Sequence, residues 1–340
     1  MAIDQECDHL IPQLAVGDVR PVPRPISTRQ VVDRENLLTV SSADSPNSRS
    51  SHQNAQVQDA GHQPFRMRSV RAAVAGLPLI LLLAAAAIEP LRLPVLLVLP
   101  MGFMATLRQA RSNGTPPSSA TFVYGACLLV ALSMAWSGIP LPAGARDGSS
   151  CANLLAPFAL YRAAGALLVL VAVALVVRLL GSTAGEIGIR RASRAGLALA
   201  LGALLAVGIV AAFIGPAVAE PFFGPLPVTL ENVSALFPAL LFAVANASME
   251  ETVYRGALLR WVMRSRGPVL AMAVQAAAFG LAHGVGSDFA GSPLPVMAAT
   301  AAGGLAFGAI SLRTGSLLLP IALHAALDVP IYYANACLQH

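Results

Sequence analysis

Ionisable side chains are rare in the apolar part of this chain, and the first group of them lies in the string Ser248–Gly256. Glu251 and Arg255 are four residues apart, so on a helix they share a face, and the guanidinium can keep the carboxylate ionised and oriented. Adjacent side chains on an α-helix point ~100° apart, which leaves Glu250 to address a different partner, such as a water molecule. The alternative is a structural ion pair on an amphipathic helix end.

Two histidines occupy similar settings further along the chain. Phe279 and His283 are four residues apart, so the phenyl ring can pack beside the imidazole and fix its rotamer. A lone histidine in an apolar helix is, however, more often a hydrogen-bonded contact between helices. His324 and Asp328 also share a helix face, which suits an aspartate-oriented histidine, two polar groups aimed into one cavity, or a self-satisfied polar couple.

The three strings are predicted to lie at one depth. Counting ~1.5 Å per residue from the arginines at the helix ends places Glu250, His283, His324 and Asp328 about 17–26 Å along their helices. Unrelated structural pairs would have no reason to share a depth. A glutamate, two histidines and an acid around one wet cavity favour hydrolysis, in which the glutamate takes a proton from water and a histidine shares it. The same set can bind Zn²⁺ through Glu250, His283 and His324.

The composition indicates which elements must position these residues. Apolar residues make up 56% of the 340 residues, charged residues only 11%, and all 22 basic residues are arginine. Charged residues usually make up ~25% of a globular chain. The few charges present here could not cover the surface of a soluble protein of this size. The chain is therefore predicted to be an all-α, multi-pass membrane protein that binds the lipid bilayer and no nucleic acid.

About eight to nine transmembrane helices are expected from the recurring apolar runs. The runs cover residues 72–88, 93–107, 120–140, 154–177, 195–215, 236–262, 268–284, 293–312 and 315–333. The second run is short and interrupted by Pro94 and Pro100, which predicts a hairpin of the first two runs dipping into the bilayer. Residues 1–71 carry eight of the 17 acids and no apolar period, so they are predicted to be a disordered tail.

Arginine placement predicts that this tail is cytoplasmic. In that orientation the outer loops hold only Arg92 and Arg146. The inner segments hold thirteen arginines: Arg66, Arg68, Arg71, Arg108, Arg111, Arg178, Arg190, Arg191, Arg194, Arg260, Arg264, Arg266 and Arg313. The expected location is the cell membrane.

The four cysteines show no zinc-like spacing. Cys151 and Cys337 both fall on the predicted outer side, where a disulfide is chemically possible. Scattered cysteines are nevertheless more typical of small apolar residues than of a disulfide, and these two are expected to be unpaired.

The three strings together resemble the ordered motifs of the CPBP intramembrane protease family, which comprises the type II CAAX prenyl endopeptidases and the bacteriocin-processing (Abi) proteins. The family pattern is Glu-Glu-x-x-x-Arg, Phe-x-x-x-His and His-x-x-x-Asn or Asp, and all three occur here in order on separate predicted helices. The resemblance covers roughly residues 236–330. It implies an all-helical endopeptidase in which Glu250 and His283 activate water.

The resemblance also implies roles for the remaining motif residues. His324 and Asp328 would be oxyanion or positioning groups, although an ionised carboxylate cannot donate a hydrogen bond. Glu251 and Arg255 would support the site. Family members are often described as metalloproteases, while the glutamate–histidine scheme needs no metal, so Zn²⁺ stays open.

These observations divide the chain into the tail 1–71, N-terminal membrane helices over 72–180 and a protease domain over 181–340. The expected function is intramembrane hydrolysis of a membrane-associated protein or peptide, either a CAAX-type prenylated protein or a bacteriocin-like peptide. One alternative is a proton-coupled transporter that uses the same acids and histidines as a relay. Another is a non-catalytic membrane scaffold or immunity protein.

Overall fold

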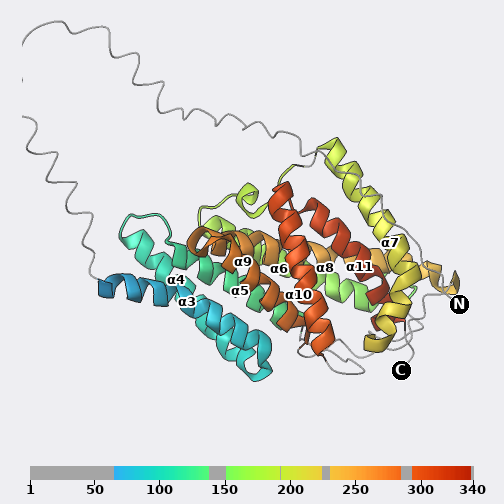
Figure 1. Ribbon diagram of the computed structural model, residues 1–340, viewed down its shortest axis with the longest axis horizontal. Coiled ribbons are helices and arrows are strands. Elements are labelled where there is room, and N and C mark those ends of the chain that lie inside the picture. Colours follow the sequence, from blue (N-terminus) through green and yellow to red (C-terminus); the bar gives the residue numbers. More distant parts are fainter. Residues whose placement is uncertain (1–64, 138–150, 192, 224–229, 285–292, 338–340) are drawn as a thin grey trace, which may run out of the picture. The chain divides into compact units, whose positions relative to one another are not determined.

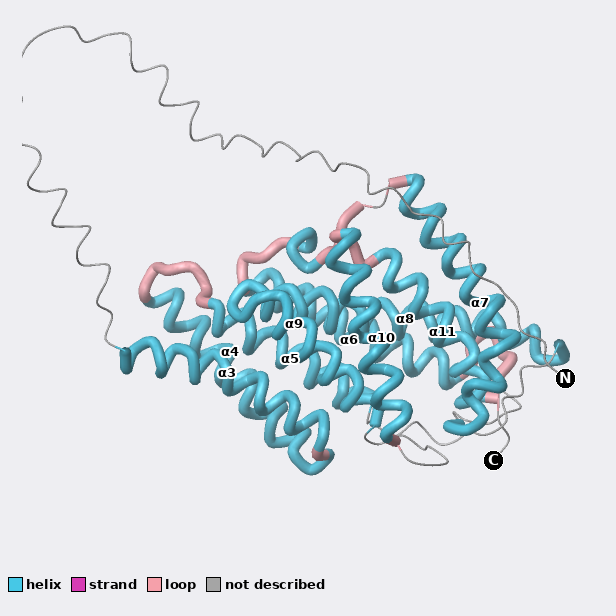
Figure 2. The backbone as a smooth tube through the Cα atoms, viewed as in Figure 1, coloured by secondary structure: helices cyan, strands magenta, loops and turns pink. Residues whose placement is uncertain are grey.

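Helices account for nearly all of the chain that the computed structural model describes, and no strand occurs in this part (Figure 2). The described residues are 65–137, 151–191, 193–223, 230–284 and 293–337. Most of the predicted tail, residues 1–64, lies outside them. Six helices are long and apolar enough to cross a membrane. The predicted all-α, multi-pass membrane fold is thus confirmed.

The helices follow the predicted apolar runs in order (Figure 1). They are α3 (Phe65–Ala87), η1 (Glu89–Leu91), α4 (Arg92–Ser112), α5 (Ser119–Ser137), α6 (Pro157–Leu179), η3 (Ala184–Ile187), α7 (Arg194–Phe223), η4 (Leu230–Ala235), α8 (Leu236–Glu250), η5 (Glu251–Leu258), α9 (Leu259–Gly284), α10 (Leu294–Thr314) and α11 (Leu318–Ala336). The apolar stretch Val233–Gly284 is 52 residues long. It turns at Gly267, whose φ of 79° is open to glycine and strained for other residues.

The first two helices differ from the prediction. α3 begins at Phe65, seven residues before the apolar run, because arginine and serine continue a helical backbone although they end a hydrophobic stretch. α4 runs unbroken over Arg92–Ser112 and is long and apolar enough to cross the membrane, whereas the second apolar run was predicted to be short and interrupted. Pro94 lies in the first turn, where no intrahelical donor is needed, and Pro100 is accommodated inside the helix.

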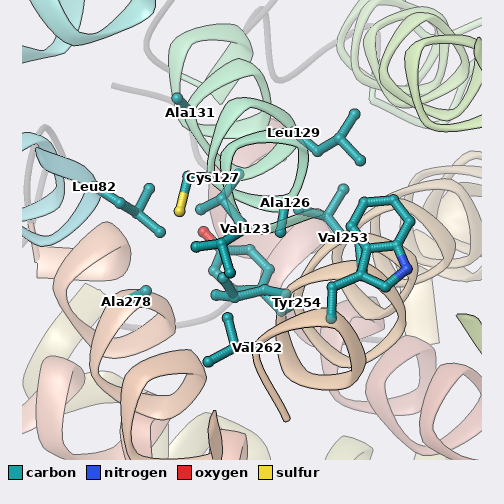
Figure 3. Close-up of a cluster of buried hydrophobic side chains, with 14 of the residues drawn as sticks. Leu82, Val123, Ala126, Cys127, Leu129, Ala131, Val253, Tyr254, Val262 and Ala278 are labelled. Carbon is teal, nitrogen blue, oxygen red and sulfur yellow. The ribbon is translucent and has the colours of Figure 1, made fainter. Parts of the chain in front are cut away.

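α5 is the packing support behind the polar motifs. Its apolar side chains contact α3, α4, α6, η5 and α9 within one buried cluster. Figure 3 shows Val123, Ala126 and Leu129 of α5 beside Val253 and Tyr254 of η5. The apolar side chains of α5 therefore pack against η5, the segment that carries Glu251 and Arg255.

The short helix η3 packs closely against η5. A Cβ atom at Gly256 would lie 2.9 Å from the carbonyl oxygen of Ile187, so only glycine allows this approach of η3 to η5. Arg264 of α9 donates a 2.5 Å hydrogen bond to Glu186. This bond holds the pKa of the Glu186 carboxyl below its usual value.

A second buried cluster joins α6, α8 and α11 through the rings of Phe158, Phe242 and Tyr332. At its end Cys151 and Cys337 form a disulfide, and the Tyr332 hydroxyl donates to the carbonyl oxygen of Cys151 at 2.8 Å. The expectation of unpaired cysteines is wrong. The two residues meet because α6 and α11 both pack against α8, a tertiary arrangement that cysteine spacing does not reveal.

The contact between α9 and α10 depends on small residues, and this gives a first test of the fold. A Cβ atom at Gly280 would lie 2.6 Å from the carbonyl oxygen of Met297 and 2.8 Å from the Cβ of Ala301. Gly280→Ala is therefore expected to destabilise the protein by about 1–3 kcal/mol through overpacking. Gly303→Ala is the matched control, since a Cβ there meets no atom within 4 Å. Thermal unfolding in detergent measures both variants, and equal midpoints would contradict the close approach.

Candidate active site

The two glutamates lie where the main chain changes its winding. α8 ends at Glu250, and the next 8 residues form the π-helix η5 before α9 begins at Leu259. π-Helical segments are rare, and they frequently occur at functional sites. Every residue of η5 is buried. The motif that contains Glu251 and Arg255 is thus wider than the α-helix expected from the sequence.

Glu250 faces both histidines of the predicted site. Its Oε2 atom lies 4.0 Å from Nε2 of His283 and 3.5 Å from Nε2 of His324. The Glu250 side chain is 12% exposed, and within the described residues its Oε2 atom accepts no protein hydrogen bond. Oε2 therefore lies between the two imidazoles with its lone pairs free of protein hydrogen bonds.

His283 is held by its own helix. Its Nδ1 atom lies 2.8 Å from the carbonyl oxygen of Phe279, and the two rings lie 4.4 Å apart, so the phenyl ring packs beside the imidazole as predicted. A carbonyl oxygen only accepts, so Nδ1 carries the hydrogen, and Nε2 faces Glu250. With 30% of its side chain exposed, His283 is the most accessible member of the site.

His324 is the centre of the buried network. Its Nδ1 atom lies 2.8 Å from Oε1 of Glu251, and its Nε2 atom lies 3.5 Å from both Glu250 and Asp328. As the sequence predicted, Glu251 pairs with Arg255 and Glu250 faces other groups, and both carboxylates also contact His324. They contact opposite nitrogens of one ring, because α11 brings His324 between them.

Arg255 neutralises this cluster from inside the protein. Its Nη1 atom lies 3.0 Å from Oε1 of Glu251, and both side chains are fully buried. The guanidinium stacks 4.1 Å above the Phe279 ring and 5.7 Å from the Phe307 ring. The contact with Glu251 lacks hydrogen-bond alignment, so charge attraction and the two ring faces hold the cation in place.

Asp328 joins the site from the next turn of α11. Its Oδ1 atom lies 3.5 Å from His324, and its Oδ2 atom accepts a 3.0 Å hydrogen bond from Nδ2 of Asn246 on α8. The carboxyl is buried. Glu250, His283, His324 and Asp328 thus converge from α8, α9 and α11 on one place within the membrane helices, with Glu251, Arg255 and Phe279 packed around them.

Comparison with known proteins follows the same residues. Residues 232–330 match the family model described as Rce1-like, type II CAAX prenyl endopeptidase Rce1-like. The chain carries an Rce1-like domain. The match spans all three motifs, and the resemblance inferred from them is confirmed. No curated protein and no solved structure matches the chain.

Metal binding by the Rce1-like domain was expected, if it occurs, through Glu250, His283 and His324. Structural and catalytic zinc sites need at least three protein ligands at about 2.0–2.3 Å from the ion. Within the described ranges, no group of three His, Cys, Asp or Glu side chains is arranged to hold a metal ion. No step below uses a metal.

Asn246 is the polar residue of the Rce1-like domain that the sequence reasoning missed. It lies four residues before Glu250 on α8, and so on the same helix face. Asn246 is neutral, so it does not stand out among the ionisable side chains of the apolar runs. A neutral amide at helical spacing from the motif glutamate would have been the signal.

Proposed function

We propose that this protein is an intramembrane endopeptidase that hydrolyses a peptide bond of a membrane-associated protein or peptide. The observation that carries the proposal is the placement of the Glu250 carboxylate between two histidine Nε2 atoms inside a bundle of membrane helices. The Rce1-like domain supports peptidase chemistry in the same residues. Hydrolysis within a bilayer needs such a group to bind and deprotonate water.

In the proposed reaction, Glu250 removes a proton from a water molecule whose second hydrogen bonds to Nε2 of His283. The resulting hydroxide attacks the scissile carbonyl carbon, and the carbonyl oxygen becomes an oxyanion. His324 lies among Glu250, Glu251 and Asp328, so three carboxylates compensate an imidazolium, and its Nε2–H can then donate to the oxyanion. The proton on Glu250 passes to the leaving amine as the carbon–nitrogen bond breaks.

The substrate class follows from the location of the site and from the family. The proposed substrates are CAAX-type prenylated proteins, with bacteriocin-like membrane peptides as the second candidate. Either one would reach the buried carboxylates with a lipid-soluble part in the bilayer. A proton-coupled relay is less well supported, because the acids and histidines belong to α8, α9, η5 and α11 and surround one imidazole.

The test uses the purified full-length chain in detergent with a quenched fluorescent CAAX peptide, either farnesylated or unmodified. Farnesyl-dependent cleavage supports the prenyl-protein substrate, and equal cleavage of both peptides supports a general membrane peptidase. The assay is repeated with a zinc chelator, and the metal-free mechanism expects an unchanged rate. Loss of activity that added Zn²⁺ restores would overturn the metal-free mechanism.

We also propose that the chain lies with its N-terminal tail in the cytoplasm. The support is twofold: arginines gather in the loops predicted to be inside, and the disulfide lies at the opposite helix ends, where an oxidising compartment favours it. The test places single cysteines at Thr314 or Glu89 after Cys7 and Cys127 are replaced. An impermeant thiol reagent should label the Thr314 variant only in inside-out vesicles and the Glu89 variant only in right-side-out ones. The reverse pattern would invert the orientation.

A further inference from the structure

The Asp328 carboxylate is an acceptor in a place where hydrolysis needs donors. Both of its oxygens already face donor groups: Oδ1 faces Nε2 of His324 at 3.5 Å, and Oδ2 accepts from Nδ2 of Asn246 at 3.0 Å. An ionised carboxylate cannot donate a hydrogen bond to an oxyanion. Asp328 can, however, fix the orientation of the group that donates to it.

That group is the side-chain amide of Asn246. The Nδ2 atom carries two hydrogens, and one of them bonds to Asp328. Turning the amide over would place its oxygen against the carboxylate, so Asp328 selects one of the two amide orientations. The second hydrogen has no side-chain or backbone acceptor among the described residues, and Asn246 is only half-buried.

The position of Asn246 relative to the proposed base completes the geometry. Asn246 and Glu250 lie four residues apart on α8, so their side chains are neighbours on one helix face. Asn246 also bonds across 82 residues to α11, the helix that carries His324. The Asn246 amide is thus a neighbour of Glu250, proposed to activate water. It is also bonded to the helix of His324, proposed to stabilise the oxyanion.

We infer that Asn246 is a catalytic residue whose second Nδ2–H donates to the carbonyl oxygen of the scissile peptide, and that Asp328 is the positioning residue that aims this amide. The inference rests on the proposed peptidase function. The carbonyl oxygen then receives two donors, one from His324 on α11 and one from Asn246 on α8. No covalent step is added, since Asn246 stabilises the negative charge that forms on the carbonyl oxygen.

The experiment compares Asn246→Ala and Asn246→Asp with the wild-type chain in the peptide-cleavage assay. Removal of one oxyanion donor usually lowers kcat by about 10²–10³-fold, and KM should change little because the donor acts mainly in the transition state. Thermal unfolding is measured on the same samples. Ser248→Ala is the matched control, since Ser248 lies two residues away on the same helix and is expected to keep wild-type kcat.

The outcomes separate this inference from the function on which it rests. A lower kcat with unchanged KM and unchanged melting supports the donor role of Asn246. Wild-type kcat in Asn246→Ala, or a loss that follows the fall in melting temperature, overturns the inference and leaves the peptidase function standing. If the wild-type chain itself cleaves neither peptide, both the function and the inference fall.

Discussion

Glu250→Gln is expected to lower kcat by about 10²–10⁴-fold, which is the usual contribution of a general base. The carboxamide has nearly the same shape and still fits between the two histidines, but it cannot take a proton from water. The 12% exposed side chain makes no protein hydrogen bond through Oε2 in the described part of the chain. The substitution should therefore leave the melting temperature and the accumulation of the protein close to wild type.

Single-turnover cleavage of the peptide measures this effect without a contribution from product release. Glu186→Gln is the matched control, because it makes the same chemical change at the 39% exposed partner of Arg264 on η3. The control should cleave at the wild-type rate. A Glu250→Gln variant that turns over like wild type would remove the assignment of this protein as a Glu250-dependent peptidase.

Arg255→Ala should unfold the protein at a markedly lower temperature and reduce its accumulation in the membrane. Arg255 is the charge partner of Glu251, and both side chains are fully buried. Leaving one charge of a buried pair alone costs about 3–5 kcal/mol. Glu251 would also lose the cation that fixes its orientation toward Nδ1 of His324, so activity should fall together with stability.

A second variant separates the two consequences of this change. Replacing the pair together, Arg255→Met with Glu251→Gln, removes both charges, and the melting temperature should largely recover while the activity stays low. Arg313→Ala is the control, because it removes an exposed arginine. Such substitutions usually change the free energy of unfolding by no more than about 0.5 kcal/mol. If Arg255→Ala melts like wild type, Glu251 must be stabilised by a group other than Arg255.

The convergence of the motif residues could be predicted because the α-helical repeat is regular. Four-residue spacing places Phe279 beside His283 and His324 beside Asp328, and a constant rise per residue puts the motifs at one depth. Both rules hold for α9 and α11. Neither rule describes how the helices pack against one another. The rules therefore predict which residues belong to the site but not which residues they contact on other helices.

The contacts between helices could not be predicted in this way. The winding of η5 and the contact of both glutamates with His324 are not encoded in the spacing of Glu250, Glu251 and Arg255. The hydrogen bond between Asn246 and Asp328 joins two helices across 82 residues, so the spacing of residues along α8 does not reveal it. In each case the partner lies on another helix, where packing decides the neighbour.

The disulfide has a consequence for the order in which the protein is made. Cys151 lies before α6, and its partner Cys337 is translated 186 residues later, after α11. While the ribosome is still synthesising the intervening helices, the Cys151 thiol has no native partner. Ring closure must therefore wait until α6 to α11 have been made and inserted, with α6 and α11 both docked on α8. The oxidised pair thus marks chains in which α6 to α11 have been inserted, and its mobility on a non-reducing gel distinguishes them from chains whose insertion stopped earlier.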